Sequence, residues 1–168
     1  MVFMISDDEV VYDEALHFLT DLIVVLDEHL EQLGARSSWD ECARDSADHV
    51  AGFGFVACQK YITSIAAVCE VGKKEALDLG PTCSAGPSVV SVINAAANMW
   101  KHEDEWKDPM TRAQERTAGV LDGVLDEGAW EYAYVNVLYA LSPDMKFSVL
   151  LDSLECWREE LRALSNTD

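Results

Sequence analysis

Apolar residues recur at intervals of three and four along most of the chain, which is the spacing of one face of an α-helix. The first long segment shows this pattern with acidic residues on the opposite side, and it predicts an amphipathic helix. Its predicted apolar stripe is Val11, Ala15, Phe18, Leu22, Leu26 and Leu33, and the acids opposite are Asp13, Asp27 and Glu31. Gly34 is expected to end the helix, because glycine readily adopts the left-handed conformation that follows a last helical turn.

A second long helix is predicted from about Ser38 to about Val71. It opens on Ser38-Trp-Asp-Glu41, which has the form of a capping box. Gly52 and Gly54 fall in its middle, where glycine is a weak helix former and permits a bend or a close neighbour.

Three further helices are predicted to begin at prolines that follow a plausible N-cap residue. Proline is favoured at the first helical position because the N–H that it lacks would be unpaired there. The predicted pairs are Gly86-Pro87, Asp108-Pro109 and Ser142-Pro143.

Residues 129–141, "AWEYAYVNVLYAL", fit both an alternating strand and a helix. A single strand would have no partner in this chain, so a helix is the preferred interpretation. The sequence therefore predicts an all-α fold, a bundle of five to seven helices in a single domain over residues 1–168, with Phe147, Leu151, Leu154, Trp157 and Leu161 buried by the last helix.

The charge of the chain changes this picture, because 168 residues carry a formal net charge of −19. Residues 1–35 contain nine Asp or Glu and no Lys or Arg. Such a field repels phosphate backbones, so nucleic acid is disfavoured as a partner. The acids either keep the surface soluble or attract a basic partner.

Composition also bears on the compartment. The five cysteines include no C-x-x-C pair, which suits a reducing environment better than a disulfide framework. No basic and apolar leader is apparent at the start, and no apolar run reaches the roughly 20 residues of a membrane span. We expect a soluble, cytoplasmic protein without a membrane partner.

Residues 91–106, "SVINAAANMWKHEDEW", hold the most conspicuous polar pattern. Asn94, Asn98 and His102 are spaced by four and share one side of the predicted helix, with Trp100 on the other. The pattern fits a solvated helix face. Asparagine is a mediocre helix former, however, so a polar seam between helices or along a groove is the alternative.

Within this stretch "ANMWKH", residues 97–102, resembles the arginine–polar–three-residue–histidine signature of the HEPN superfamily. The resemblance implies a helical bundle, often dimeric, of a kind common in prokaryotic toxin–antitoxin and antiviral systems, in which many members are metal-independent RNases. Asn98 matches the polar residue and His102 the histidine, while Ala97 stands where the family has arginine. Loss of that cation, which would stabilise charge at a reacting phosphate, implies a degenerate member that does not cleave RNA.

Acids flank several histidines, which makes a metal site a candidate. Glu14-x-x-His17 and Asp45-x-x-x-His49 each place two ligand types on one helix face. A di-iron helical bundle needs two Glu-x-x-His motifs and further glutamates, and the chain has only the first. We expect no metal and no cofactor.

The sequence thus favours a non-enzymatic, acidic helical interaction protein of bacterial type, immunity- or antitoxin-like or regulatory, that binds a basic protein. The binding candidates are Asn94, Asn98, His102, Trp106, Asp13, Asp27 and Glu31. Trp106 is included because tryptophan is enriched at interaction hot spots. A homodimer stays open, and the alternatives are a HEPN-type RNase that uses Asn98 and His102, or a metal-dependent helical-bundle enzyme.

Overall fold

Helices account for most of the residues in the computed structural model, which describes residues 4–5, 12–35, 40–84, 86–106 and 109–165. These residues form seven α-helices, which confirms the all-α prediction, together with one 3-10 helix and a two-residue strand pair. The α-helices are α1 (Glu14–Gly34), α2 (Glu41–Val68), α3 (Lys73–Leu77), α4 (Val89–Lys101), α5 (Arg112–Leu121), α6 (Ala133–Leu141) and α7 (Ser148–Ser165). The 3-10 helix η1 is Glu103–Glu105, and strands β1 (Met4–Ile5) and β2 (Tyr12–Asp13) pair antiparallel, with Met4 opposite Asp13.

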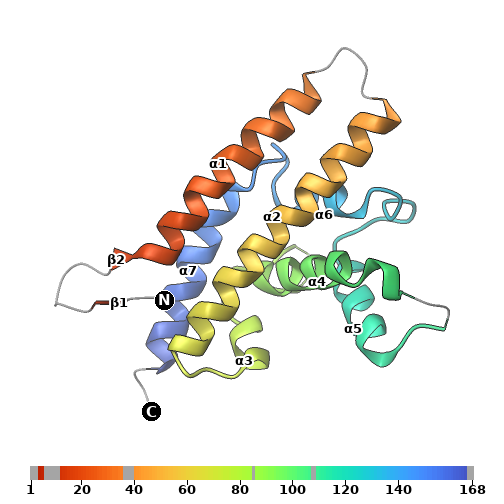
Figure 1. Cartoon of the computed structure of the whole chain (residues 1–168). Helices are drawn as coiled ribbons and strands as arrows, with labels where there is room; N and C mark the ends of the chain where they lie inside the picture. Colours follow the sequence, from red (N-terminus) through yellow and green to blue (C-terminus); the bar gives the residue numbers. More distant parts are fainter. Residues whose placement is uncertain (1–3, 6–11, 36–39, 85, 107–108, 166–168) are drawn as a thin grey trace.

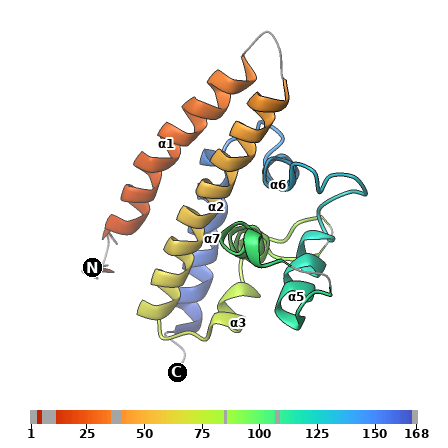
Figure 2. The same ribbon diagram turned by 45° about the vertical axis from the view of Figure 1, so that its right-hand side comes forward.

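Helix α2 is the centre of the arrangement. It forms an antiparallel pair with α1 at the edge of the molecule, and α7 lies along this pair (Figure 1). Helix α4 crosses α2 and separates it from α5, as Figure 2 shows with α4 viewed nearly end-on. The buried apolar cluster runs from Leu16 in α1 to Leu161 in α7.

The two glycines in α2 permit close approach of large rings. A Cβ atom on Gly52 would lie 2.0 Å from Cδ1 of Trp100, and one on Gly54 would lie 2.3 Å from Cζ of Phe147. The expected close neighbours are therefore present, one on each side of the helix. These contacts bring α4 and the start of α7 against the middle of α2.

The predicted apolar stripe of α1 was only partly right about which side is covered. Leu33 is buried as expected. Phe18 and Leu22, both expected in the core, are 74% and 41% exposed, while Val11 lies outside the described residues. The buried residues of α1 are Leu16, Leu19, Ile23, Leu30 and Leu33. Apolar residues occupy about half of the circumference of this helix, so periodicity alone could not decide which part would be covered.

The predicted proline starts were also wrong. Helix α4 begins after Ser88, whose hydroxyl accepts from the N–H of Ser91, and α5 begins after Thr111, which forms a capping box with Gln114. Ser142 ends α6 as its C-cap and does not begin α7. Asp108 and Ser38 lie outside the described residues, and Asp40 is the N-cap of α2. Side chains that accept the first free N–H groups thus decided these starts, and prolines did not.

Helix α6 confirms the helical interpretation for most of residues 129–141, since Ala133–Leu141 is helical and residues 129–132 form turns. Among the described residues α2 is the one helix long and apolar enough to span a membrane. Of the window that meets this test, 56% is buried inside the fold. A core helix passes the same test, and α2 has that position here.

Candidate functional site

Asp13, a predicted binding residue, is buried where α1, α2 and α7 meet. Its Oδ1 accepts from the backbone N–H of Leu16 at 2.9 Å, as an N-cap of α1. Its Oδ2 accepts from the Tyr61 hydroxyl at 2.7 Å and from Nη1 of Arg158 at 3.1 Å. The Asp13 side chain is only 3% exposed, so its charge is balanced within the chain.

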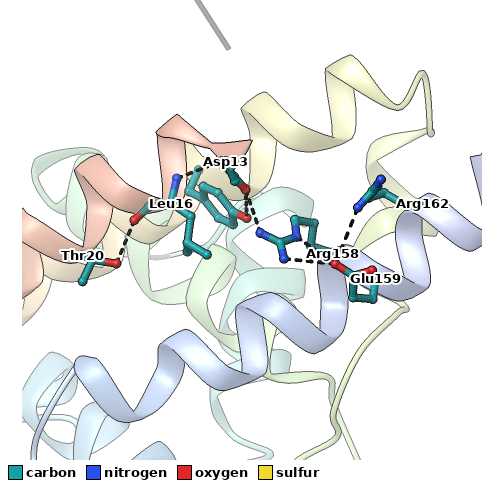
Figure 3. Close-up of polar contacts among 7 residues, drawn as sticks. Asp13, Leu16, Thr20, Arg158, Glu159 and Arg162 are labelled. Carbon is teal, nitrogen blue, oxygen red and sulfur yellow. Dashed lines mark hydrogen bonds and ion pairs between the residues drawn. The ribbon is translucent and has the colours of Figure 1, made fainter. Parts of the chain in front are cut away.

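Arg158 extends this cluster along α7. Its Nη2 donates to Oε1 of Glu159 at 3.0 Å, and Arg162 lies 3.8 Å from the same oxygen (Figure 3). Burial raises the pKa of the Tyr61 hydroxyl, and its hydrogen bond to Asp13 raises it further, so Tyr61 stays a donor. We call Asp13, Tyr61 and Arg158 the buried ion-pair cluster. Every one of these groups has a partner, which is the mark of a structural role.

Asp27, the second predicted acid, also turns inward. Its two carboxylate oxygens accept from the backbone N–H groups of Phe147 and Ser148, at 2.7 and 3.0 Å. Asp27 therefore caps α7 from a neighbouring helix. Glu31, the third acid, is exposed and lies 3.9 Å from Nζ of Lys146. The three acids expected on one face thus have three separate surroundings.

Asn94 and Asn98 lie in a seam between α4 and α2. Nε2 of Gln59 donates to Oδ1 of Asn94 and to Oδ1 of Asn98, both at 2.9 Å. Nζ of Lys101 donates to Oε1 of Gln59 at 2.6 Å. The alternative of a polar seam therefore fits the asparagines better than a solvated face does, and Gln59 is the residue that the sequence pattern did not reveal.

His102 is separated from this seam. It is the C-cap of α4, its side chain is 52% exposed, and Nδ1 lies 3.2 Å from Oε2 of Glu105. The Asn98 amide oxygen is bound to Gln59. The backbone N–H of His102 donates to the Asn98 carbonyl at 3.3 Å, as at an ordinary helix end, but no hydrogen bond joins their side chains within the described chain. The two residues of the family-like run thus have different surroundings in this protein.

Trp106, another predicted binding residue, lies at a cavity. The cavity has a volume of about 490 Å³ and is bounded by residues of α2, α4, η1, α5, α6 and the segment before α6. Trp130 and Tyr134 supply further aromatic walls, and Met99 and Met110 supply thioether groups. The acids of the cavity are Asp48, Glu103, Asp122 and Glu131. We call these nine residues the aromatic–acidic pocket.

The charges in this pocket are not balanced. No Lys, Arg or His is among its described lining residues, and Glu103, Asp122 and Glu131 make no ion pair in the described part of the chain. Burial raises the pKa of Asp48, and the charge of Glu103 adds to this effect. Burial and the charges of Glu103 and Asp48 also raise the pKa of Tyr134. The pocket therefore has a strongly negative field beside aromatic walls.

Sequence reasoning found Trp106 and missed the rest of this pocket. The signal that pointed toward it was the acidic run between Trp100 and Trp106, which contains Glu103. Asp48 and Trp130 are far from that run in the chain, and only the packing of α6 beside α2 brings them together. Asp48 also accepts from the N–H of Val135 at 2.9 Å, so it both caps α6 and lines the pocket.

Metal-binding and nucleophilic groups in the described part of the chain are further candidates for a site. Among the described residues, no group of three His, Cys, Asp or Glu side chains is placed to hold a metal ion, and this applies to Glu14, His17, Asp45 and His49. Burial raises the pKa of the Cys58 thiol to about 12, so this cysteine is protonated and unreactive near neutral pH. The aromatic–acidic pocket is thus the strongest candidate binding site.

Comparison of the chain with protein-family models, with curated proteins and with solved structures found no match.

Proposed function

We propose that this protein is a non-enzymatic, acidic interaction protein that binds a basic protein partner, as an immunity, antitoxin-like or regulatory factor of the cytoplasm. The observation that carries the proposal is the outward side of α1. There an apolar row and an acidic row run side by side on a helix without Lys or Arg.

The apolar row consists of Phe18, Leu22 and Val25, which are 74%, 41% and 60% exposed. Their spacing of four and three places them along one line of the helix, next to the residues that pack on α2. Exposed apolar side chains in a continuous row are typical of interaction surfaces, whereas isolated ones are ordinary. Helix α1 lies at the edge of the molecule in both views, with α2 and α7 on its inner side (Figures 1 and 2).

The acidic row consists of Glu14, Asp21 and Glu28, which are exposed and spaced by seven. We call the two rows together the α1 face. An amphipathic helix with Lys or Arg beside its apolar stripe matches this face in both hydrophobicity and charge. A second copy of this chain would bring its own acidic row and a charge of −19, so charge favours a basic partner over a homodimer.

The test is a binding experiment with a defined partner. Tagged full-length protein captures partners from the source cell at low and at high salt. A captured basic protein is then purified, and its Kd is measured by calorimetry. We expect the affinity to fall steeply with salt, and Phe18→Ser with Leu22→Ser to weaken binding about tenfold or more.

The matched control is Val149→Ser, which removes an exposed apolar side chain from α7 and leaves the residues of the α1 face unchanged. It should leave the Kd unchanged. Failure to reconstitute any complex with a basic protein would overturn the proposal, as would a complex indifferent to the α1 variants. Light scattering on the free protein separates a partner complex from a homodimer.

A further inference from the structure

We infer that the aromatic–acidic pocket binds an organic ammonium ion, as a free alkylated amine or as the ammonium end of a lysine side chain. This goes beyond the proposed function, because the pocket and the α1 face share no residue. The shared chemistry of the two sources is a positive nitrogen on an apolar stem.

The walls of the pocket suit such a cation. Trp106, Trp130 and Tyr134 present three aromatic rings to one cavity, and tryptophan is the ring that attracts cations most strongly. Met99 and Met110 add polarizable, adaptable surface for an apolar stem. The volume of about 490 Å³ falls within the usual range of small-molecule sites.

The rim provides the charge that a cation needs. Asp48, Glu103, Asp122 and Glu131 line the pocket, and none of its described lining residues is basic. An anion would therefore be repelled, and a neutral apolar ligand would leave the field of these acids unbalanced. Because no three carboxylates converge as a metal site within the described residues, the arrangement fits a large, diffuse cation better than a small metal ion.

Tyr134 gives an independent indication of a ligand. The residue is only 4% exposed, yet its hydroxyl makes no hydrogen bond to any described residue. In the described structure every fully buried side-chain N or O atom has a hydrogen-bond partner. The Tyr134 hydroxyl has none among these residues, so it is not fully buried, and the cavity that Tyr134 lines gives access to it. Water in the cavity can bond to this hydroxyl, and a polar ligand that displaces the water would take its place.

The test titrates the full-length protein with choline and with its neutral isostere 3,3-dimethylbutan-1-ol. Tryptophan fluorescence and the indole N–H signals in NMR spectra report binding. We expect choline to bind and the neutral isostere to bind at least tenfold more weakly. The Trp130→Leu variant should lose about tenfold in affinity for choline, and Glu103→Gln with Glu131→Gln should lose a similar factor.

Glu105→Gln is the matched control, because Glu105 is an exposed acid that contacts His102 and does not line the pocket. It should bind choline as the unchanged protein does. Circular dichroism checks that each variant is folded, and Trp130 is 37% exposed, so its replacement is expected to be tolerated.

Two further ligands distinguish the sources. A lysine-containing peptide that binds more tightly than choline, and loses binding when the lysine is acetylated, assigns the pocket to a protein side chain. Tighter binding of choline assigns it to a free amine, and both results support the inference. Three results would overturn the inference. They are equal affinities for choline and its neutral isostere, no binding of either choline or the lysine peptide, and an affinity for choline that Trp130→Leu does not change. Leu22→Ser should leave ammonium binding intact, so failure of the α1-face proposal would be seen separately.

Discussion

The buried ion-pair cluster and the aromatic–acidic pocket use the same residue types in opposite ways. Each region combines carboxylate and tyrosine side chains, and α2 contributes one residue to each. That residue is Tyr61 in the cluster and Asp48 in the pocket. In the cluster Asp13 meets a hydroxyl, a backbone N–H and a guanidinium. In the pocket, four acids line one cavity without a basic residue among the described lining.

The difference shows how a structural acid can be told from a candidate functional one. A carboxylate taken out of water is costly unless it is paired and hydrogen-bonded, and Asp13 meets both conditions. In the pocket Glu103, Asp122 and Glu131 are exposed, so water solvates them and no basic residue among the described lining neutralises them. Within the described chain, the acids behind the net charge of −19 therefore fall into two groups, those paired within the chain and those without a basic partner. Only the second group is available to a binding partner.

Removing the cation from the buried cluster should have the largest effect. Arg158→Met leaves Asp13 buried without its positive partner, and we expect the free energy of unfolding to fall by about 3 kcal/mol. Urea denaturation followed by circular dichroism measures the change.

Arg162→Met is the control for this variant, because Arg162 lies 3.8 Å from Glu159 and does not contact Asp13. Its expected cost is below about 1 kcal/mol. Equal losses in the two variants would show that Arg158 acts through general packing and not through Asp13.

The two tyrosines provide a matched pair of intermediate effect. Tyr61→Phe removes the hydroxyl that donates to Asp13, and we expect a loss of about 1.5 kcal/mol in the free energy of unfolding. Tyr134→Phe removes a hydroxyl with no hydrogen bond to the described residues, so its expected change is below about 0.5 kcal/mol. A larger loss at Tyr134 than at Tyr61 would contradict the distinction between the two regions.

Asp48→Asn should have the smallest effect at neutral pH, and its sign is informative. An asparagine can still accept from the Val135 N–H while removing a negative charge that burial and Glu103 disfavour. We therefore expect the free energy of unfolding at pH 7 to stay within about 0.5 kcal/mol or to rise. Asp13→Asn, in contrast, should be clearly destabilising, since it removes the charge that Arg158 pairs with.

The pH dependence of the free energy of unfolding, compared between the unchanged protein and Asp48→Asn, tests the raised pKa of Asp48. The folded protein takes up this proton at a higher pH than the unfolded chain, whose carboxyl has the ordinary value of 3.8. Between the raised value and 3.8, acid should thus stabilise the unchanged protein relative to Asp48→Asn. Urea denaturation at a series of pH values measures this difference, and parallel curves would contradict the shift.

Much of the fold could be predicted from local patterns. The helical period gave the extents of α1 and α2 to within a few residues, and the glycines of α2 indicated close neighbours. The covered side of α1 could not be predicted, because its apolar residues spread over half of the helix. The covered side is the one that packs Leu19, Ile23 and Leu30 into the core. The contacts of Asp13 with Arg158 and of Asp27 with the start of α7 join this side to segments more than a hundred residues away.

The candidate site was less predictable. Asn94 and Asn98 stood out by spacing, but their partner Gln59 lies on another helix. Trp106 and the neighbouring acids were visible as a run, whereas Asp48, Trp130 and Tyr134 carried no local signal. Local periodicity reports which side chains share a helix face, and it contains no information about which helices meet.

The sequence by itself determined an all-α protein with a strong negative charge, because helical periodicity and composition are local properties of the chain. Only the tertiary structure decided which acids are paired, which apolar row of α1 stays uncovered and which aromatic rings surround one cavity. These outcomes depend on contacts between segments far apart in the sequence. Burial and pairing make Asp13 part of the framework, whereas Glu103, Asp122 and Glu131 stay exposed beside one cavity, where their charges can attract a cation.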